Sequence, residues 1–417
     1  MKTRNILDYL FVCILINLIP VILLKVFEIP SKIYTILVLF VYAIQTLIMC
    51  WAVRKKIKET SKNIIIVLIV FFILQIIAQL CSYFRWQNVE IQDMANILSL
   101  TVNIFIYLYL CSKFEIMKKD FIAFMKKMIV VGLVSCIYNI IVNWEVILNF
   151  FGLEYSYLVS ISSFFPNRNQ FGSFMLIMIV ATLYILINQK DKKYIFLLLI
   201  FMINLILTMS RNAILGMGLV LIFFILFNLK DFCKKLSKKQ IIIICCIIAV
   251  LIIVGIILLI TIPEISDTID RLFLRTYTID PTSGRMKVWT NGIQIWQNNP
   301  LIGVGRFQAI NINQTVYNSE LDQFHNIYIE TLVSYGIVGL VGLAYIIIRE
   351  MKEVKNSLID KISKKLMIIS IAVFLVISFF ETTCRFAIGY VDTLNMIFYF
   401  TIPLIYANIK DEKEEEK

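Results

Sequence analysis

Long apolar stretches alternate with short polar segments from one end of the chain to the other. Most of these stretches reach the ~20 residues that an α-helix needs to cross the hydrocarbon core of a bilayer. The run 194–209 is shorter, and only Ser210 and Arg211 separate it from the next one, which indicates either a tight hairpin or a break in one long element. The pattern predicts twelve membrane spans: 6–24, 33–53, 63–84, 94–112, 121–143, 169–188, 194–209, 212–229, 240–262, 326–348, 364–381 and 393–409.

The composition agrees with a membrane protein. Of the 417 residues, 60% are hydrophobic and 16% are charged, and a soluble protein has too little interior to bury so much apolar surface. The nine Cys lie almost entirely within or beside apolar runs, which does not indicate a disulfide framework. The first run is long for a signal peptide and no small-x-small cleavage site follows it, so we expect it to be retained.

The positive charge predicts how the spans are oriented. With the N-terminus inside, 29 of the 40 Lys and Arg fall in the inner segments and 11 in the outer ones, and every alternate loop agrees with this division. The formal net charge of +12 therefore reports membrane topology, and we expect no nucleic acid partner. Both termini are expected to be cytoplasmic.

The spans and loops define an all-α polytopic fold with about twelve transmembrane helices. Residues 1–262 hold the first nine spans, 263–325 form one large outer loop, 326–409 hold the last three spans, and 410–417 are a charged cytoplasmic tail.

The large outer loop contains a predicted amphipathic helix. Arg285, Trp289, Ile293 and Trp296 share one face, and Trp on such a face is typical of helices at the membrane interface. We expect 298–300 to end this helix and 303–305 to form a flexible turn. The helix either anchors the loop to the bilayer or helps to close a site.

The outer charge is nearly all arginine. Eight of the 11 Arg are outside, against three of the 29 Lys, and topology alone does not favour either residue. Arginine differs in its planar fork, which binds phosphate or carboxylate at two points. Pairing with outer acids is the simpler explanation for Arg271 and Arg275, which lie near Glu264, Asp267 and Asp270 in the sequence.

Three other outer arginines, Arg168, Arg211 and Arg285, are candidates for binding an anion. Each stands where a helix is predicted to begin, so helix-terminal amides could add to the guanidinium group. Arg211 has no nearby acid in the sequence and should meet either a distant carboxylate or an anionic ligand.

His325, at the end of the large loop, is the only histidine. It is either a proton acceptor or the anchor of a helix end. Gly336, Gly339 and Gly342 recur at helical spacing and favour close approach of another helix. The sequence has no Asp-x-Asp motif, no Walker loop and no Cys/His cluster, so we expect neither a metal ion nor a cofactor.

Several motifs between residues 166 and 342 together resemble the O-antigen polymerase and ligase superfamily, the Wzy/WaaL-like integral membrane glycosyltransferases. They are Ser210-Arg211, Ser283-Gly284-Arg285 followed by Trp289, Asn299-Pro300-Leu301-Ile302-Gly303-Val304-Gly305, and His325-Asn326-x9-Gly336-x2-Gly339. Asn167-Arg168-Asn169 is similar to the family's Asn-Pro-Asn segment, with Arg in place of Pro. The motifs do not distinguish a polymerase from a ligase, and the first five spans match only in being hydrophobic.

The resemblance implies a GT-C-like fold and a function at the outer leaflet of a bacterial plasma membrane. The implied substrates are sugar repeat units on undecaprenyl diphosphate, and a chain-length regulator and a flippase of the same pathway are implied partners. We expect a metal-independent polymerase in which Arg211 and Arg285 hold the diphosphate and His325 activates the acceptor hydroxyl. Further candidate contacts are Arg168, Asn326 and Arg306, and after them Glu381 and Arg385. A ligase acting on a lipid, wall or protein acceptor, or a lipid-linked oligosaccharide flippase, is the alternative.

Overall fold

The computed structural model describes residues 3–53, 116–148, 161–233, 284–321, 323–357, 360–381, 402–407 and 409–410, with scattered positions within 66–77 and 257–282. The predicted spans 63–84, 94–112, 240–262 and 393–409 lie wholly or mostly outside these residues. Arg271, Arg275 and Arg385 lie outside them as well.

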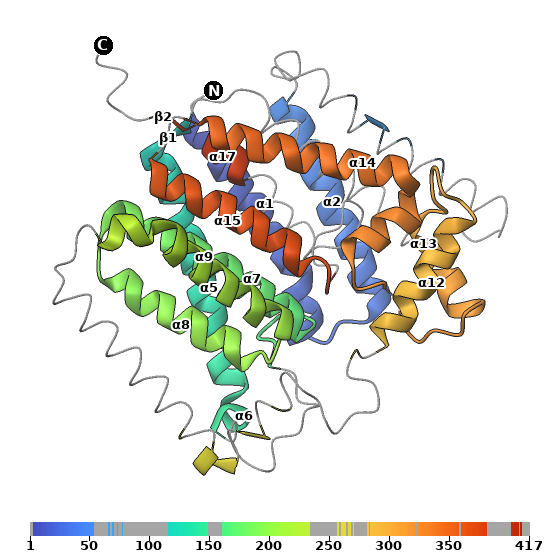
Figure 1. Ribbon diagram of the computed structural model, residues 1–417, viewed down its shortest axis with the longest axis horizontal. Helices are drawn as coiled ribbons and strands as arrows, with labels where there is room; N and C mark the ends of the chain where they lie inside the picture. The colour runs from blue at the N-terminus through green and yellow to red at the C-terminus, as the bar shows by residue number, and fades with distance from the viewer. Residues whose placement is uncertain are drawn as a thin grey trace.

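The described chain is mostly helical (Figure 1). Its helices are α1 (Thr3–Val26), α2 (Ser31–Val53), α5 (Lys118–Val142), α6 (Trp144–Leu148), α7 (Arg168–Gln189), α8 (Lys193–Leu207), α9 (Arg211–Cys233), α12 (Arg285–Gln297), α13 (Arg306–Thr315), α14 (Ile327–Asn356), α15 (Lys361–Ile377) and α17 (Ile402–Ala407). Two short strands, β1 (Ile116–Met117) and β2 (Ile409–Lys410), pair in parallel, and β1 contacts α1.

Eight of the predicted spans are helices in the structure, displaced by only a few residues at most ends. Among the described residues, five helices are long and apolar enough to cross a membrane: α1, α5, α7, α9 and α14. The run around Ser210 is resolved as two separate helices, because α8 ends at Leu207 and α9 begins at Arg211. The helix predicted to begin at Arg285 and to end before Asn298 is confirmed as α12, while its position at the membrane interface stays a prediction.

Helix α7 is the central element of the bundle. In its most apolar 18-residue window 83% of the residues are buried, against 28% in α9, and α7 packs on α5, α8, α9 and α15. Such a helix is apolar on all sides because it has protein on all sides. By contrast, α8 and α9 leave large apolar side chains exposed, such as Phe196, Ile203 and Ile222, as lipid-facing helices do.

Helix α14 is broken at Gly336, where φ is 68° and ψ is −163°. The segment 300–305 lies in this break and pairs with its backbone: Val304 N donates to Val333 O at 2.9 Å, and Ile337 N donates to Pro300 O at 2.9 Å. A break exposes amides and carbonyls that need partners, and the loop segment supplies them.

This arrangement corrects two expectations. The glycine at 336 admits a loop segment and not another helix, since a Cβ there would lie 2.1 Å from Leu301 O. The turn at 303–305 exists, with positive φ at Gly303 and Gly305, but it is held by hydrogen bonds and is not a flexible link.

One end of the molecule collects the first residues of α7, α9, α12 and α14 and the segment that follows α15. Asn169 at the start of α7 contacts both Ser210 and Glu381, and Arg285 at the start of α12 also contacts Glu381. Helices α12 and α13 lie beside the first part of α14, away from α8 (Figure 1). Arg211, Arg285 and His325, which the charge pattern assigns to the outer face, therefore lie at one end.

Candidate functional site

The carboxylate of Glu381 is the centre of the site. Its side chain is 6% exposed, and its oxygens are divided between three elements. Oε1 lies 2.7 Å from His325 Nδ1, while Oε2 accepts hydrogen bonds from Arg285 Nη2 at 3.2 Å and from Asn169 Nδ2 at 2.8 Å. A buried carboxylate is stable as an anion only with such partners. It joins the start of α7, the start of α12 and the segment before α14.

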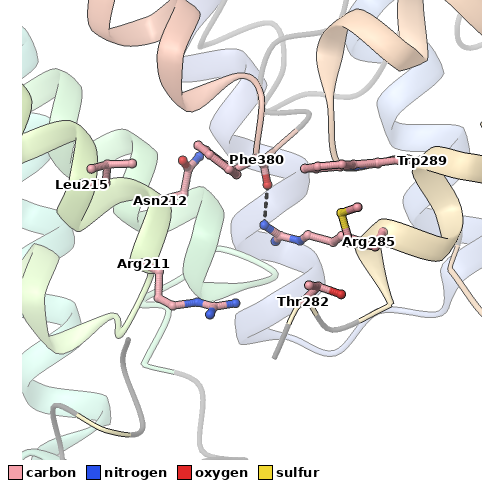
Figure 2. A pocket seen from close by; sticks show the side chains of 8 residues that line it. Arg211, Asn212, Leu215, Thr282, Arg285, Trp289 and Phe380 are labelled. Atoms are coloured by element: carbon pink, nitrogen blue, oxygen red, sulfur yellow. Dashed lines mark hydrogen bonds between the residues drawn. The ribbon is translucent and has the colours of Figure 1, made fainter. Parts of the chain in front are cut away.

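Arg285 is the first residue of α12. Gly284 precedes it with φ of 79°, a conformation that glycine adopts without a steric penalty and that turns the chain into the helix. The second terminal nitrogen of Arg285, Nη1, donates to the carbonyl oxygen of Phe380 (Figure 2). Both ends of the guanidinium fork are thus held by the segment that follows α15, which fixes the plane of the group.

The backbone around His325 is held from both sides. Its φ of 49° lies in the left-handed region, which non-glycine residues seldom adopt. Before it, the Phe324 carbonyl accepts a hydrogen bond from Trp289 Nε1 at 2.8 Å. After it, the Asn326 side chain caps α14 by accepting from Tyr328 N and Ile329 N. Strained residues of this kind persist where the surroundings fix them, and they are concentrated at functional sites.

The contact with Glu381 also orients the imidazole. Because a carboxylate accepts hydrogen bonds, a neutral ring carries its proton on Nδ1 and keeps the lone pair on Nε2. The histidine side chain is 17% exposed, so the protein covers the ring only in part. The ring can therefore accept a proton, and the neighbouring carboxylate would stabilise the imidazolium that results.

A pocket of about 420 Å³ lies beside this cluster. Arg211, the first residue of α9, and Arg285 point toward one another across it, as Figure 2 shows. Two like charges at close range favour the binding of an anion between them. The remaining walls are mostly apolar; the other lining residues are Asn212, Leu215, Thr282, Met286, Trp289 and Phe380. The pocket therefore suits an anion that carries an apolar group.

The other predicted contacts, Arg168, Asn326 and Arg306, are not among the described residues that line the pocket. Arg168 opens α7 behind its cap Asn167, which accepts a hydrogen bond from Gln170 N, and the next residue, Asn169, is the one that contacts Glu381. Arg306 opens α13, and its Nε lies 2.9 Å from Glu330 Oε1, with both side chains at most 7% exposed. For Arg168, Asn326 and Arg306, contact with a substrate stays a prediction.

Sequence reasoning ranked Glu381 below the arginines. The available signal was an acid at the outer end of an apolar run, but nothing local indicates that it meets His325, which lies 56 positions earlier. Asn169 belongs to the Asn167-Arg168-Asn169 segment, but nothing in the sequence indicates that it contacts Glu381, and the role of the Phe380 carbonyl carries no signal in the sequence. Within the part of the chain that the structure covers, no three His, Cys, Asp or Glu side chains gather where a metal ion could bind.

Residues 194–344 match the family model described as O-antigen ligase. The match begins in α8, ends within α14, and includes Arg211, Arg285 and His325. No curated protein matches the chain. The match supports an O-antigen ligase-like or polymerase-like function in a membrane protein and does not separate the two. Together with the motifs above, the match of residues 194–344 supports the O-antigen polymerase and ligase superfamily for this chain.

Proposed function

We propose that the protein is a polysaccharide polymerase. It transfers a growing glycan from undecaprenyl diphosphate to a hydroxyl group of another lipid-linked repeat unit, at the outer leaflet of the plasma membrane and without a metal ion. The observation that supports this most is the pair of arginines, Arg211 and Arg285, facing one another in a pocket with otherwise mostly apolar walls. His325 is connected to that pair through Glu381.

The pocket has the two chemical properties that a lipid diphosphate requires. The guanidinium groups can donate several charge-assisted hydrogen bonds to phosphate oxygens, and they supply positive charge without an ion. Leu215, Met286 and Phe380 offer an apolar surface to the first isoprene units. All three are at least 41% exposed, so this side of the pocket is open toward the surface along α9.

The proposed transfer is a substitution at the anomeric carbon of the donor sugar. The acceptor hydroxyl oxygen forms a bond to that carbon and gives its proton to His325 Nε2. The bond between the carbon and the phosphate oxygen breaks, and its electron pair leaves with the diphosphate. Arg211 and Arg285 stabilise the charge that develops on the leaving group, and Glu381 stabilises the imidazolium.

Substitution of Arg211 tests the proposal. In liposomes with purified lipid-linked repeat units, we expect Arg211→Gln to lower the polymerisation rate by roughly 10²–10³-fold, as removal of a charge-stabilising donor does. Lys287→Gln is the matched control, because it removes a positive charge from an exposed position on α12 outside the pocket. Equal rates for Arg211→Gln and Lys287→Gln would contradict the proposal.

A ligase is the second candidate, favoured by the description of the matching family model. The same site would then transfer a finished glycan to a lipid, wall or protein acceptor. A deletion strain separates the two functions. Single repeat units accumulating on the lipid carrier indicate a lost polymerase, and full-length polymer remaining on the carrier indicates a lost ligase.

A further inference from the structure

Glu381 contacts two side chains that have different roles in the proposed reaction. Oε1 contacts His325, the proposed base, and Oε2 contacts Arg285, a proposed ligand of the diphosphate. Arg211 faces Arg285 from α9. The carboxylate of Glu381 therefore contacts one end of the fork that a diphosphate would need.

We propose that Glu381 is a positioning residue that couples diphosphate binding to the activation of His325. Before a diphosphate binds, Glu381 holds Arg285 and His325 together. An arriving diphosphate competes for Arg285. As the pair between Arg285 and Glu381 weakens, the carboxylate interacts more strongly with His325. This inference rests on the proposed function, because it assumes that Arg285 binds the diphosphate.

The competition has a definite sign. The carboxylate is an anion that draws on the same guanidinium charge that the diphosphate needs, so its negative charge opposes diphosphate binding in the intact protein. Removing the carboxylate charge should therefore tighten diphosphate binding while it slows the transfer. A residue that only held Arg285 in place would do the opposite, because its loss would disorder the fork and weaken binding.

The effect on His325 follows from the same contact. A carboxylate that no longer shares its charge with a guanidinium group accepts a stronger hydrogen bond from Nδ1–H. The ring then carries more electron density at Nε2, the atom that takes the proton from the acceptor hydroxyl. His325 would become its most basic only when the lipid-linked glycan donor is bound. Before the donor binds, the site would therefore be less active toward water.

The first measurement is the affinity of the full-length protein in nanodiscs for inorganic pyrophosphate. Relative to wild type, we expect Glu381→Gln to bind at least about fivefold more tightly, the lower end of ordinary coupling between sites. In the polymerisation assay the same variant should be at least about 10²-fold slower, and Glu381→Asp should recover part of the rate. Arg285→Gln should lose pyrophosphate binding.

The second measurement uses the fact that the chain has one histidine. With ring-15N-histidine and a tag that lacks histidine, all imidazole signals come from His325. Saturating pyrophosphate should move the Nδ1–H proton signal downfield in wild type, and by much less in Glu381→Gln. Asp8→Asn is the matched control, since it removes the charge of a carboxylate on α1 that is ion-paired with Lys127 on α5; its histidine signal should respond as wild type does.

The outcomes separate the inference from the function. Weaker pyrophosphate binding by Glu381→Gln, or an equal histidine response in wild type and Glu381→Gln, overturns the coupling and leaves the proposed function standing. Pyrophosphate binding that survives Arg285→Gln unchanged, or no binding to wild type, overturns the diphosphate site itself and the coupling with it. Thermal unfolding of each variant shows whether it still folds. If Glu381→Gln does not fold, Glu381→Asp is compared with wild type in the same two measurements.

Discussion

At His325 a single backbone angle connects the fold with the chemistry. The residue stands between two fixed points, the Phe324 carbonyl bound by Trp289 and the Asn326 cap of α14, and its φ of 49° turns the ring toward Glu381. Sequence reasoning could select this residue because the chain has no other imidazole. It could not foresee the left-handed backbone, which depends on contacts with α12 and α15.

The strained angle suggests a substitution that separates fold from function. Asparagine tolerates the left-handed region better than most residues and its amide can donate to a carboxylate, so we expect His325→Asn to fold, with a loss of about 0.5–1.5 kcal/mol from the changed contact with Glu381. It lacks a basic nitrogen, so the transfer rate should fall by about 10²–10⁴-fold. Thermal unfolding in detergent and the polymerisation assay measure the two effects. Polymer formation at the wild-type rate would show that His325 is not the base.

At the scale of elements, the break in α14 explains why the motif at 299–305 and the glycines after His325 occur together. Segment 300–305 forms hydrogen bonds with both sides of Gly336, and it continues directly into α13. It therefore connects the end of α12 to the middle of α14. Since α12 carries Arg285 and α14 begins beside His325, this connection fixes the positions of these two residues relative to one another.

The close approach at Gly336 predicts a large cost for a small side chain. In Gly336→Ala the new Cβ would lie 2.1 Å from Leu301 O with φ at 68°, so we expect a loss of more than about 3 kcal/mol from strain and displaced hydrogen bonds. Gly218→Ala, on α9, is the control. No atom lies within 4 Å of its Cβ, and alanine should stabilise a helix there by about 0.5–1 kcal/mol. If both variants unfold at the same temperature, the break is not held as tightly as the structure indicates.

For the whole molecule, local sequence patterns predict the helices but not the contacts between them. The ends of α5, α7, α9 and α12 could be anticipated, because apolar runs, polar caps and the Asn-Asn-Pro stop act within a few residues. The site could not, because Asn169 and Glu381 are 212 positions apart and meet only when α7 packs beside α15. The charge pattern did indicate that the site residues share one face of the membrane, because this pattern depends on the alternation of whole spans.

The lysines of the chain allow the predicted orientation to be tested without a mutation. Three Lys are expected outside, among them Lys25 and Lys287, while Lys193 and Lys352 are expected inside, and these four side chains are all exposed in the structure. Of these four, a membrane-impermeant amine reagent applied to intact cells should label only Lys25 and Lys287. After permeabilisation it should label Lys193 and Lys352 as well, which shows that those two amines are reactive. Mass spectrometry of the digested protein identifies each site.

Labelling of Lys193 or Lys352 in intact cells, with Lys287 protected, would reverse the orientation and place Arg211, Arg285 and His325 on the cytoplasmic side, where the proposed outer-leaflet reaction could not occur.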